Sequence, residues 1–194
     1  PFRLNVDGEW HESQALIIAS GASARWLNLP NEQKLIGHGV SSCATCDGFF
    51  YRGKKIMVIG GGDSAMEEAN FLTRFGEEVT LVHRREQFRA SKIMLARAQA
   101  NPKVKFLLNT VVEDVHDVKQ NLVTSVTLRN LATGNVWEQA VDGFFVAIGH
   151  IPNTAPFRGQ LALDPDGYVL STGGARTNIE GVFHAGDVQD RIYR

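Results

Sequence analysis

The sequence predicts an α/β fold in which a parallel sheet of the dinucleotide-binding kind is joined to an antiparallel β meander. The first observation is a unit of strand, glycine turn, helix and strand over residues 55–82. The second is a series of strand-like segments over residues 104–141, separated by polar turns. The length of 194 residues agrees, since it corresponds to one or two domains of about 150 residues.

Composition and charge exclude several classes of protein. The chain has 20 Lys plus Arg and 21 Asp plus Glu, and this balance argues against nucleic acid or an anionic membrane as its main partner. No apolar run approaches the length of about 18 residues that a membrane span needs. Two cysteines are too few for a disulfide-stapled secreted scaffold, and we expect a cytoplasmic protein.

The elements can be assigned in chain order. Residues 2–18 read as β structure, with a hairpin turn at Asp7-Gly8. A strand at 55–59 leads directly into Gly60-Gly61-Gly62, and the helix that follows spans 64–75. The remaining expected elements are a strand at 79–82, a helix at 90–100, meander strands at 104–112, 122–129 and 135–141, a buried strand at 144–148, and short strands near 168–170 and 181–184.

The glycine turn matches a dinucleotide fingerprint. Gly60, Gly62 and Ala65 fit the pattern G-x-G-x-x-G/A, in which the glycines allow a tight turn and close approach to a pyrophosphate. The following helix would offer backbone N–H groups and the positive end of its dipole to the phosphates. A purely structural glycine turn is the alternative, but dinucleotide binding is favoured because the motif lies between a predicted strand and a predicted helix.

The end of the second strand indicates which dinucleotide is bound. An NAD site usually carries Asp or Glu about 20 residues past the glycines. Here the strand ends in His83-Arg84-Arg85, with Arg89 close behind. Guanidinium groups suit a phosphate on the ribose, so NADPH is favoured over the alternative of a solvated basic turn.

The two cysteines form a Cys43-Ala44-Thr45-Cys46 motif. A zinc half-site would need further ligands, of which His38 is the one plausible candidate, and no metal is expected. A pair of buried structural thiols is a second alternative. A redox dithiol fits best, and Asp47 beside it could carry protons, although Asp47-Gly48 taken alone would read as an ordinary turn. Because nicotinamide does not usually reduce a disulfide directly, a flavin is expected between them.

Five segments together carry a family resemblance. They are Cys43-Ala44-Thr45-Cys46-Asp47-Gly48-Phe49-Phe50-Tyr51-Arg52, Gly60-Gly61-Gly62-Asp63-Ser64-Ala65, His83-Arg84-Arg85-x-x-Phe88-Arg89-Ala90, Phe145-Val146-Ala147-Ile148-Gly149-His150 and Gly186-Asp187-x-x-Asp190-x-Ile192-Tyr193-Arg194. In sequence and order they resemble the bacterial low-molecular-weight thioredoxin reductases, which are NADPH-dependent flavoprotein disulfide reductases. The resemblance spans essentially the whole chain.

The resemblance implies a three-layer FAD/NAD(P)-binding Rossmann-like domain inserted into an incomplete FAD domain. Residues 26–148 would form the NADPH-binding domain with the redox dithiol, and residues 1–25 and 149–194 would be parts of the FAD domain. The family's own glycine fingerprint for FAD and its closing helix are not in this sequence. We therefore expect a fragment lacking both ends, with an incomplete FAD site and no activity alone.

The resemblance also assigns roles to residues. Cys46 would face the flavin, Cys43 would attack the disulfide of thioredoxin, and Asp47 would be the acid–base group. The pyrophosphate would be held by Gly60, Gly62, Ser64 and Ala65, the 2′-phosphate by His83, Arg84, Arg85 and Arg89, and FAD by Asp187 and Arg194, while Asp63 and Ile148 complete the cofactor-binding set.

The expected function is thioredoxin-disulfide reduction, with electrons passing from NADPH through FAD to Cys43–Cys46 and then to thioredoxin. The full-length protein would be a homodimer. One alternative is a related flavoprotein disulfide reductase, such as the reductase partner of a peroxidase. The other is that the truncated chain is only an NADPH-binding module, which measurement of bound FAD would decide.

Overall fold

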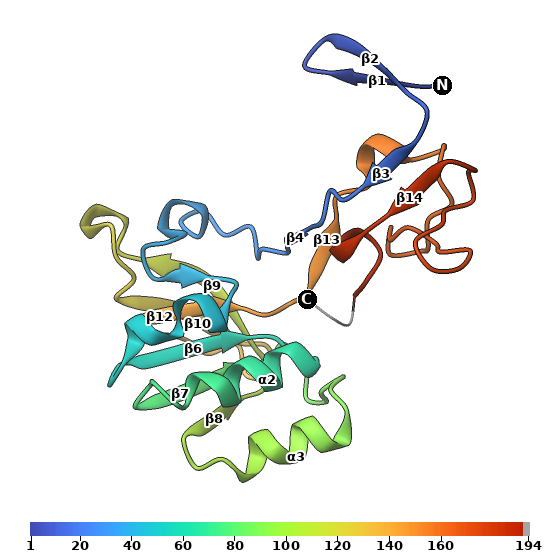
Figure 1. The fold of residues 1–194 in the computed structure, drawn as a ribbon. Coiled ribbons are helices and arrows are strands. Elements are labelled where there is room, and N and C mark those ends of the chain that lie inside the picture. The colour runs from blue at the N-terminus through green and yellow to red at the C-terminus, as the bar shows by residue number, and fades with distance from the viewer. Residues whose placement is uncertain (192–194) are drawn as a thin grey trace. The chain divides into compact units, whose positions relative to one another are not determined.

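A computed structural model describes residues 1–191, and the chain divides into two compact units (Figure 1). Residues 25–149 form one unit, called here the inserted unit. Residues 1–24 and those from His150 onward form the other, called the flanking unit. One unit is therefore continuous in sequence, whereas the other is built from two separate segments.

The inserted unit has three layers around a five-stranded parallel sheet (Figure 1). In spatial order the sheet contains β5 (Val40–Ser41), β12 (Gly143–Val146), β6 (Lys55–Ile59), β7 (Glu78–Val82) and β8 (Val104–Leu107). Helices α2 (Asp63–Leu72) and α3 (Lys92–Ala100) pack on one face. The other face carries an antiparallel sheet of β9 (Thr110–His116), β10 (Ser125–Asn130) and β11 (Val136–Ala140).

Alternating apolar side chains of the central strands explain why both faces are covered. On β6, Ile56 and Val58 lie in the core beneath the helices, with Ala65 and Leu72 of α2. Their neighbour Met57 lies in the opposite core, shared with the antiparallel sheet. Strands that are apolar on both sides must be buried on both sides, as is usual for parallel sheets.

The redox motif and the segments around it form short elements. A four-residue helix, α1 (Ala44–Asp47), begins directly after Cys43 and packs on α2. The other short elements of this unit are the 3₁₀ helices η1 (Gln33–Leu35), η2 (Gly48–Tyr51) and η3 (Val118–Gln120).

The flanking unit has short strands and its own small core. Strand β3 (Leu16–Ile18) pairs in parallel with β14 (Val182–His184), although the two are far apart in the sequence. Its core contains Ile18, Leu161, Val169, Val182 and Val188. The other elements are the hairpin β1 (Phe2–Val6) and β2 (Glu9–Ser13), the pair β4 (Ala22–Ala24) and β13 (His150–Pro152), and the 3₁₀ helices η4 (Ala155–Phe157) and η5 (Gly186–Val188).

Most predicted elements are confirmed, with two corrections. The predicted strand 104–112 is wrong as a single strand, because β8 ends in the parallel sheet and β9 begins in the antiparallel one. Asn109 between them has a φ of 50°, a left-handed conformation that turns the chain. Near residues 168–170 there is only an isolated bridge between Leu163 and Val169 rather than a strand. No helix in the described part of the chain is both long and apolar enough to cross a membrane.

Candidate redox dithiol and dinucleotide site

The two cysteines of the motif are joined in a disulfide. Their Cα atoms are 5.3 Å apart, and the Cys46 side of the pair is exposed. Cys43 is the N-cap residue of α1, and its Sγ accepts a hydrogen bond of 3.2 Å from the Cys46 N–H. The Thr45 hydroxyl lies 3.4 Å from the same sulfur. Donors at this sulfur would stabilise a thiolate on Cys43 after reduction, and the disulfide favours the redox interpretation over a zinc half-site.

Asp47 lies at the other end of the same short helix, half-buried. Its Oδ2 accepts a hydrogen bond of 2.6 Å from the hydroxyl of Ser41. The structure thus brings Asp47 and the dithiol together on one helical turn, as an acid–base role beside the sulfurs requires.

Two aromatic side chains follow the dithiol and are largely exposed. Phe49 and Phe50 are 60% and 68% exposed, and the Arg52 guanidinium lies 4.9 Å from the centre of the Phe49 ring. The sequence suggested no role for this pair, because an aromatic pair usually belongs to a core. Exposed aromatic side chains beside a reactive disulfide form a surface suited to contact with another protein.

The glycine turn is held by contacts that differ from one glycine to the next. A Cβ on Gly60 would lie 2.3 Å from the Ala147 carbonyl oxygen and 2.6 Å from the Ala65 Cβ. A Cβ on Gly62 would meet nothing within 4 Å. Gly60 and the small Ala65 are therefore required by packing, whereas Gly62 leaves open space at the start of α2, where the fingerprint places the pyrophosphate.

Gly61 was not among the predicted residues, yet it is as constrained as Gly60. A Cβ there would lie 2.2 Å from Cε1 of His83. His83 is only 6% exposed as a residue. Its ring stacks on Phe88 with a centroid distance of 5.1 Å, and its Nε2 lies 3.2 Å from the Gln87 carbonyl oxygen. The sequence signal that could have identified it is a glycine between Gly60 and Gly62, at a position where the G-x-G-x-x-A pattern allows any residue.

The charge state of His83 follows from its surroundings. Burial lowers the pKa of His83, the hydrogen bond with the Gln87 carbonyl opposes this, and the charges of Arg89, Arg84 and Arg85 lower the pKa further. The imidazole is therefore neutral at pH 7. Its position beneath Gly61 suits support of the glycine turn.

The arginine-bearing segment is tied to the glycine turn by backbone hydrogen bonds. The Gly61 carbonyl accepts from the N–H groups of Arg89 and Ala90, at 2.8 and 3.1 Å. Asp63 Oδ1 accepts from the Ser91 N–H at 2.6 Å, and Ser91 is the N-cap of α3. The two predicted phosphate-binding segments thus form one connected structure.

The three arginines are exposed. Within residues 1–191, no carboxylate forms an ion pair with Arg84, Arg85 or Arg89. Ser64 is also exposed at the start of α2, where the first backbone N–H groups have no partner within the helix. Cationic side chains and helical N–H groups on connected segments are the donor set that a phosphorylated dinucleotide needs.

Glu68 is a buried carboxyl group on the same helix. Its Oε2 is buried and has no hydrogen-bond partner among the described residues. Burial, together with the negative charge of Glu67, raises the pKa of Glu68 to about 7. Nothing in the sequence indicated this burial, because the second of two consecutive Glu residues on a helix usually faces solvent.

The remaining predicted residues are dispersed. Ile148 follows β12 and packs against the core beneath the antiparallel sheet. Asp187 lies half-buried in η5 of the flanking unit. Arg194 lies outside the described residues.

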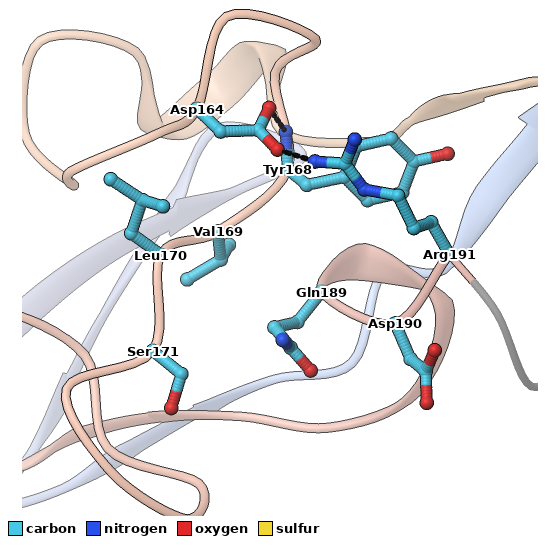
Figure 2. Close-up of a pocket in the computed structure, with 8 residues that line it drawn as sticks. All are labelled: Asp164, Tyr168, Val169, Leu170, Ser171, Gln189, Asp190 and Arg191. Atoms are coloured by element: carbon cyan, nitrogen blue, oxygen red, sulfur yellow. Dashed lines mark hydrogen bonds and ion pairs between the residues drawn. The ribbon is translucent and has the colours of Figure 1, made fainter.

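A pocket of the flanking unit lies close to Asp187 in the sequence and includes Gln189, Asp190 and Arg191 (Figure 2). Arg191 forms ion pairs with Asp164 and Asp166, and its guanidinium lies 4.9 Å from the centre of the Tyr168 ring. This arginine is already neutralised by two carboxylates, so it offers little attraction to a phosphate.

Comparison with known proteins gives a consistent result. Residues 3–194 match the family described as pyridine nucleotide-disulphide oxidoreductase. The chain is 54% identical over 190 residues to a thioredoxin reductase of Mycolicibacterium smegmatis, covering 97% of this chain and 60% of the relative. It is 53% identical to a bifunctional thioredoxin reductase/thioredoxin of Mycobacterium leprae, covering 98% of this chain and 42% of the relative.

Solved structures agree with this result. A crystal structure of Lactococcus lactis thioredoxin reductase matches with a TM-score of 0.83 and 38% identity, covering 99% of this chain and 63% of that one. The chain thus spans about two fifths to two thirds of the length of these proteins. The predicted α/β fold class, with a Rossmann-like parallel sheet and an antiparallel meander, is confirmed.

Proposed function

The chain belongs to the pyridine nucleotide-disulphide oxidoreductase family, and from that membership we propose that the protein containing it is a thioredoxin reductase that takes electrons from NADPH. The observation that carries the proposal is a disulfide, Cys43–Cys46, with Asp47 on the same helical turn, in one compact unit with a glycine turn and three exposed arginines. One compact unit therefore contains both the proposed site for NADPH, a hydride donor, and the Cys43–Cys46 disulfide, which can accept two electrons.

The described residues fit NADPH. Open space at Gly62 and the N–H groups at the start of α2 would take the pyrophosphate, and Arg84, Arg85 and Arg89 would take the 2′-phosphate. Asp63 and His83 would act indirectly, by holding the arginine segment and the glycine turn. When bound, NADPH would supply a hydride, and FAD would relay its two electrons to the dithiol. Among the described residues Asp187 alone does not make a flavin site, whereas exchange with thioredoxin needs only the dithiol and Asp47.

The dithiol would exchange with thioredoxin in two steps. The Cys43 thiol gives its proton to Asp47, and the resulting thiolate attacks the thioredoxin disulfide, forming a mixed disulfide and releasing one thioredoxin sulfur, which takes that proton from Asp47. The Cys46 thiol then gives its proton to Asp47 and attacks the Cys43 sulfur, which re-forms the Cys43–Cys46 disulfide and releases the second thioredoxin sulfur, which takes this proton from Asp47. Two electrons and two protons pass from the dithiol to thioredoxin, and the dithiol is oxidised.

Two observations support thioredoxin as the partner. One relative carries both a reductase and a thioredoxin in its name. Phe49 and Phe50 provide an exposed aromatic surface next to the disulfide. A cytoplasmic location agrees with this partner, because thioredoxin keeps thiols reduced in the cytosol. The homodimer remains a prediction, to be read from the mass of the full-length protein in solution.

The test is thioredoxin reduction by the full-length protein, followed through NADPH absorbance. We expect turnover with NADPH to exceed that with NADH, and Cys43→Ser or Cys46→Ser to abolish it. Arg84→Ala should weaken NADPH binding by about tenfold while NADH binding changes little, because a charge-assisted contact to the 2′-phosphate is lost. No reduction of thioredoxin, or an equal loss for both nucleotides, would contradict the proposal or its NADPH site respectively.

A further inference from the structure

Ser41 is a buried side chain that links the dithiol segment to Asp47. It lies at the end of β5 and is 5% exposed. Its Oγ accepts a hydrogen bond of 3.0 Å from the Cys43 N–H and donates one of 2.6 Å to Asp47 Oδ2. One hydroxyl therefore touches both ends of the helical turn that carries the disulfide.

The direction of these bonds follows from the chemistry of a hydroxyl. Ser41 has one proton to donate, and Asp47 Oδ2 at 2.6 Å is a better acceptor than the Cys43 carbonyl at 3.5 Å. The Cys43 N–H occupies a lone pair of the same oxygen and fixes the rotation of the hydroxyl. Hydrogen bonds in such a chain strengthen one another, and the last of them ends on a charged group.

The backbone that carries the Ser41 hydroxyl is part of the central parallel sheet. Ser41 is paired with Phe145 of β12 in the parallel sheet, and Phe145 is completely buried. Asp47, by contrast, lies at the end of a four-residue helix rather than in the sheet. The hydrogen bond engages Oδ2 and leaves Oδ1 as the carboxylate oxygen without a hydrogen-bond partner among the described residues.

We infer that Ser41 is a positioning residue for proton transfer by Asp47, holding the carboxylate in one orientation beside the dithiol. The inference rests on the proposed function. In the exchange step the proton moves from Asp47 to the departing sulfur, and Ser41 keeps its own proton on Oγ throughout. Its contribution passes entirely through Asp47.

A double-mutant cycle in the full-length protein tests this dependence. Ser41→Ala should lower kcat for thioredoxin reduction about tenfold with KM for thioredoxin changed less than about twofold, while Asp47→Asn should lower kcat about a hundredfold. In the Asp47→Asn background, Ser41→Ala should cost less than about twofold, because there is no acid left to orient. The inference would be overturned if the fold-loss in kcat of the double variant equalled the product of the two single losses. It would also be overturned if Ser41→Ala alone caused no loss.

A second pair of variants separates the hydroxyl from packing. Ser41→Thr and Ser41→Val have nearly the same shape, so any steric cost or folding defect is common to both. The Thr variant should be about tenfold faster than the Val variant, and equal rates would overturn the inference. Ser125→Ala is the matched control, since Ser125 is also buried and donates to a carboxylate, that of Glu138 in the antiparallel sheet. It should leave kcat unchanged.

Failure of the proposed function is distinguishable from failure of this inference. If the wild-type protein does not reduce thioredoxin, the proposed function fails. The same cycle can still be run as exchange between the prereduced dithiol and oxidised glutathione, a step that needs neither NADPH nor thioredoxin. The Ser41 effect should again vanish in the Asp47→Asn background, and persistence of the effect would refute the positioning role.

Discussion

The three consecutive glycines at residues 60–62 have different surroundings, so a side chain would be excluded or allowed at each position for a different reason. Gly60 has Ala147 and Ala65 against it, and Gly61 has the His83 ring. Gly62 has open space. None of the three has a positive φ, so close approach by neighbours, rather than backbone conformation, explains the first two. Substitutions should therefore separate stability from binding along three adjacent positions.

Gly60→Ala should destabilise the protein by about 3 kcal/mol, because neither a carbonyl oxygen nor the Ala65 Cβ can move aside easily. Gly62→Ala should cost less than about 1 kcal/mol of stability, yet weaken NADPH binding about tenfold by filling the open space where we propose that the pyrophosphate binds. Urea unfolding and NADPH titration of both variants would measure this. Similar stability losses at the two positions would contradict the packing argument.

Glu68 gives the stability a pH dependence whose sign is unusual for a carboxylate. Its pKa is raised from 4.5 to about 7, so the folded state holds the proton more tightly than the unfolded chain does. This stabilisation is full below pH 4.5 and is lost as the pH rises toward 7, amounting to at most about 3 kcal/mol.

Glu68→Gln should therefore flatten the dependence of the unfolding free energy on pH between about 5 and 7.5. Urea midpoints at several pH values would show the difference from the wild-type protein. Glu77→Gln is the control, because Glu77 is exposed and should leave the profile unchanged. If the Glu68 and Glu77 variants give the same profile, the buried carboxyl does not cause the dependence.

Among the elements, the loop between β7 and α3 is held in place by the turn between β6 and α2. Asp63, at the start of α2, binds the N–H of Ser91, at the start of α3. The Gly61 carbonyl holds Arg89 and Ala90. The arginines proposed to bind the 2′-phosphate are thereby held in a fixed position relative to the glycines proposed to bind the pyrophosphate.

Asp63→Ala should loosen this registration and weaken NADPH binding about five- to tenfold, with a smaller effect on NADH. Asp63→Asn keeps an oxygen that can accept from Ser91 and should retain most of the affinity. Fluorescence titration with both nucleotides would measure the ratio. An equal loss for the two nucleotides would mean that Asp63 does not act through the arginine segment.

At this scale the sequence predicted the strand–turn–helix–strand unit because its apolar periodicity and its glycines agree. It did not separate β8 from β9, since apolar residues continue on both sides of Asn109 and a single left-handed residue leaves no periodic signal. A redox role for the Cys43 and Cys46 pair could be predicted from its spacing, and Asp47 from its place next to the pair, but the sequence does not show whether the two thiols are oxidised. Ser41 could not, because a serine two residues before a cysteine is common and only the folded chain brings its hydroxyl to Asp47.

For the molecule as a whole, the inserted unit has the properties of an independent domain. It owns two apolar cores, one on each face of its sheet. The segment near its N-terminal end is held by Glu32. This side chain is completely buried and accepts hydrogen bonds from the N–H groups of Leu27, Asn28 and Leu29. The ends of the unit meet, since the Arg25 N–H donates to the Gly149 carbonyl at 2.9 Å.

Residues 25–149 expressed alone should therefore fold cooperatively and bind NADPH with the affinity of the longer chain to within about twofold. Urea unfolding and NADPH titration would measure both. Glu32→Ala in the same polypeptide should lower stability by about 2–4 kcal/mol, because three backbone N–H groups lose their buried acceptor. Non-cooperative unfolding of the isolated unit would show that it depends on the flanking segments.

The hydrogen bond between Arg25 and Gly149 has a consequence for how such a protein could arise. The two ends of residues 25–149 lie side by side, so this unit can replace a short loop between the two segments of the flanking unit. Its insertion therefore costs the flanking unit little loop-closure entropy. A nucleotide-binding module with adjoining ends can be gained or exchanged at one position without redesign of its host. Linking residues 25 and 149 and opening a new terminus at the exposed Thr133-Gly134 turn should give a circular permutant that still binds NADPH.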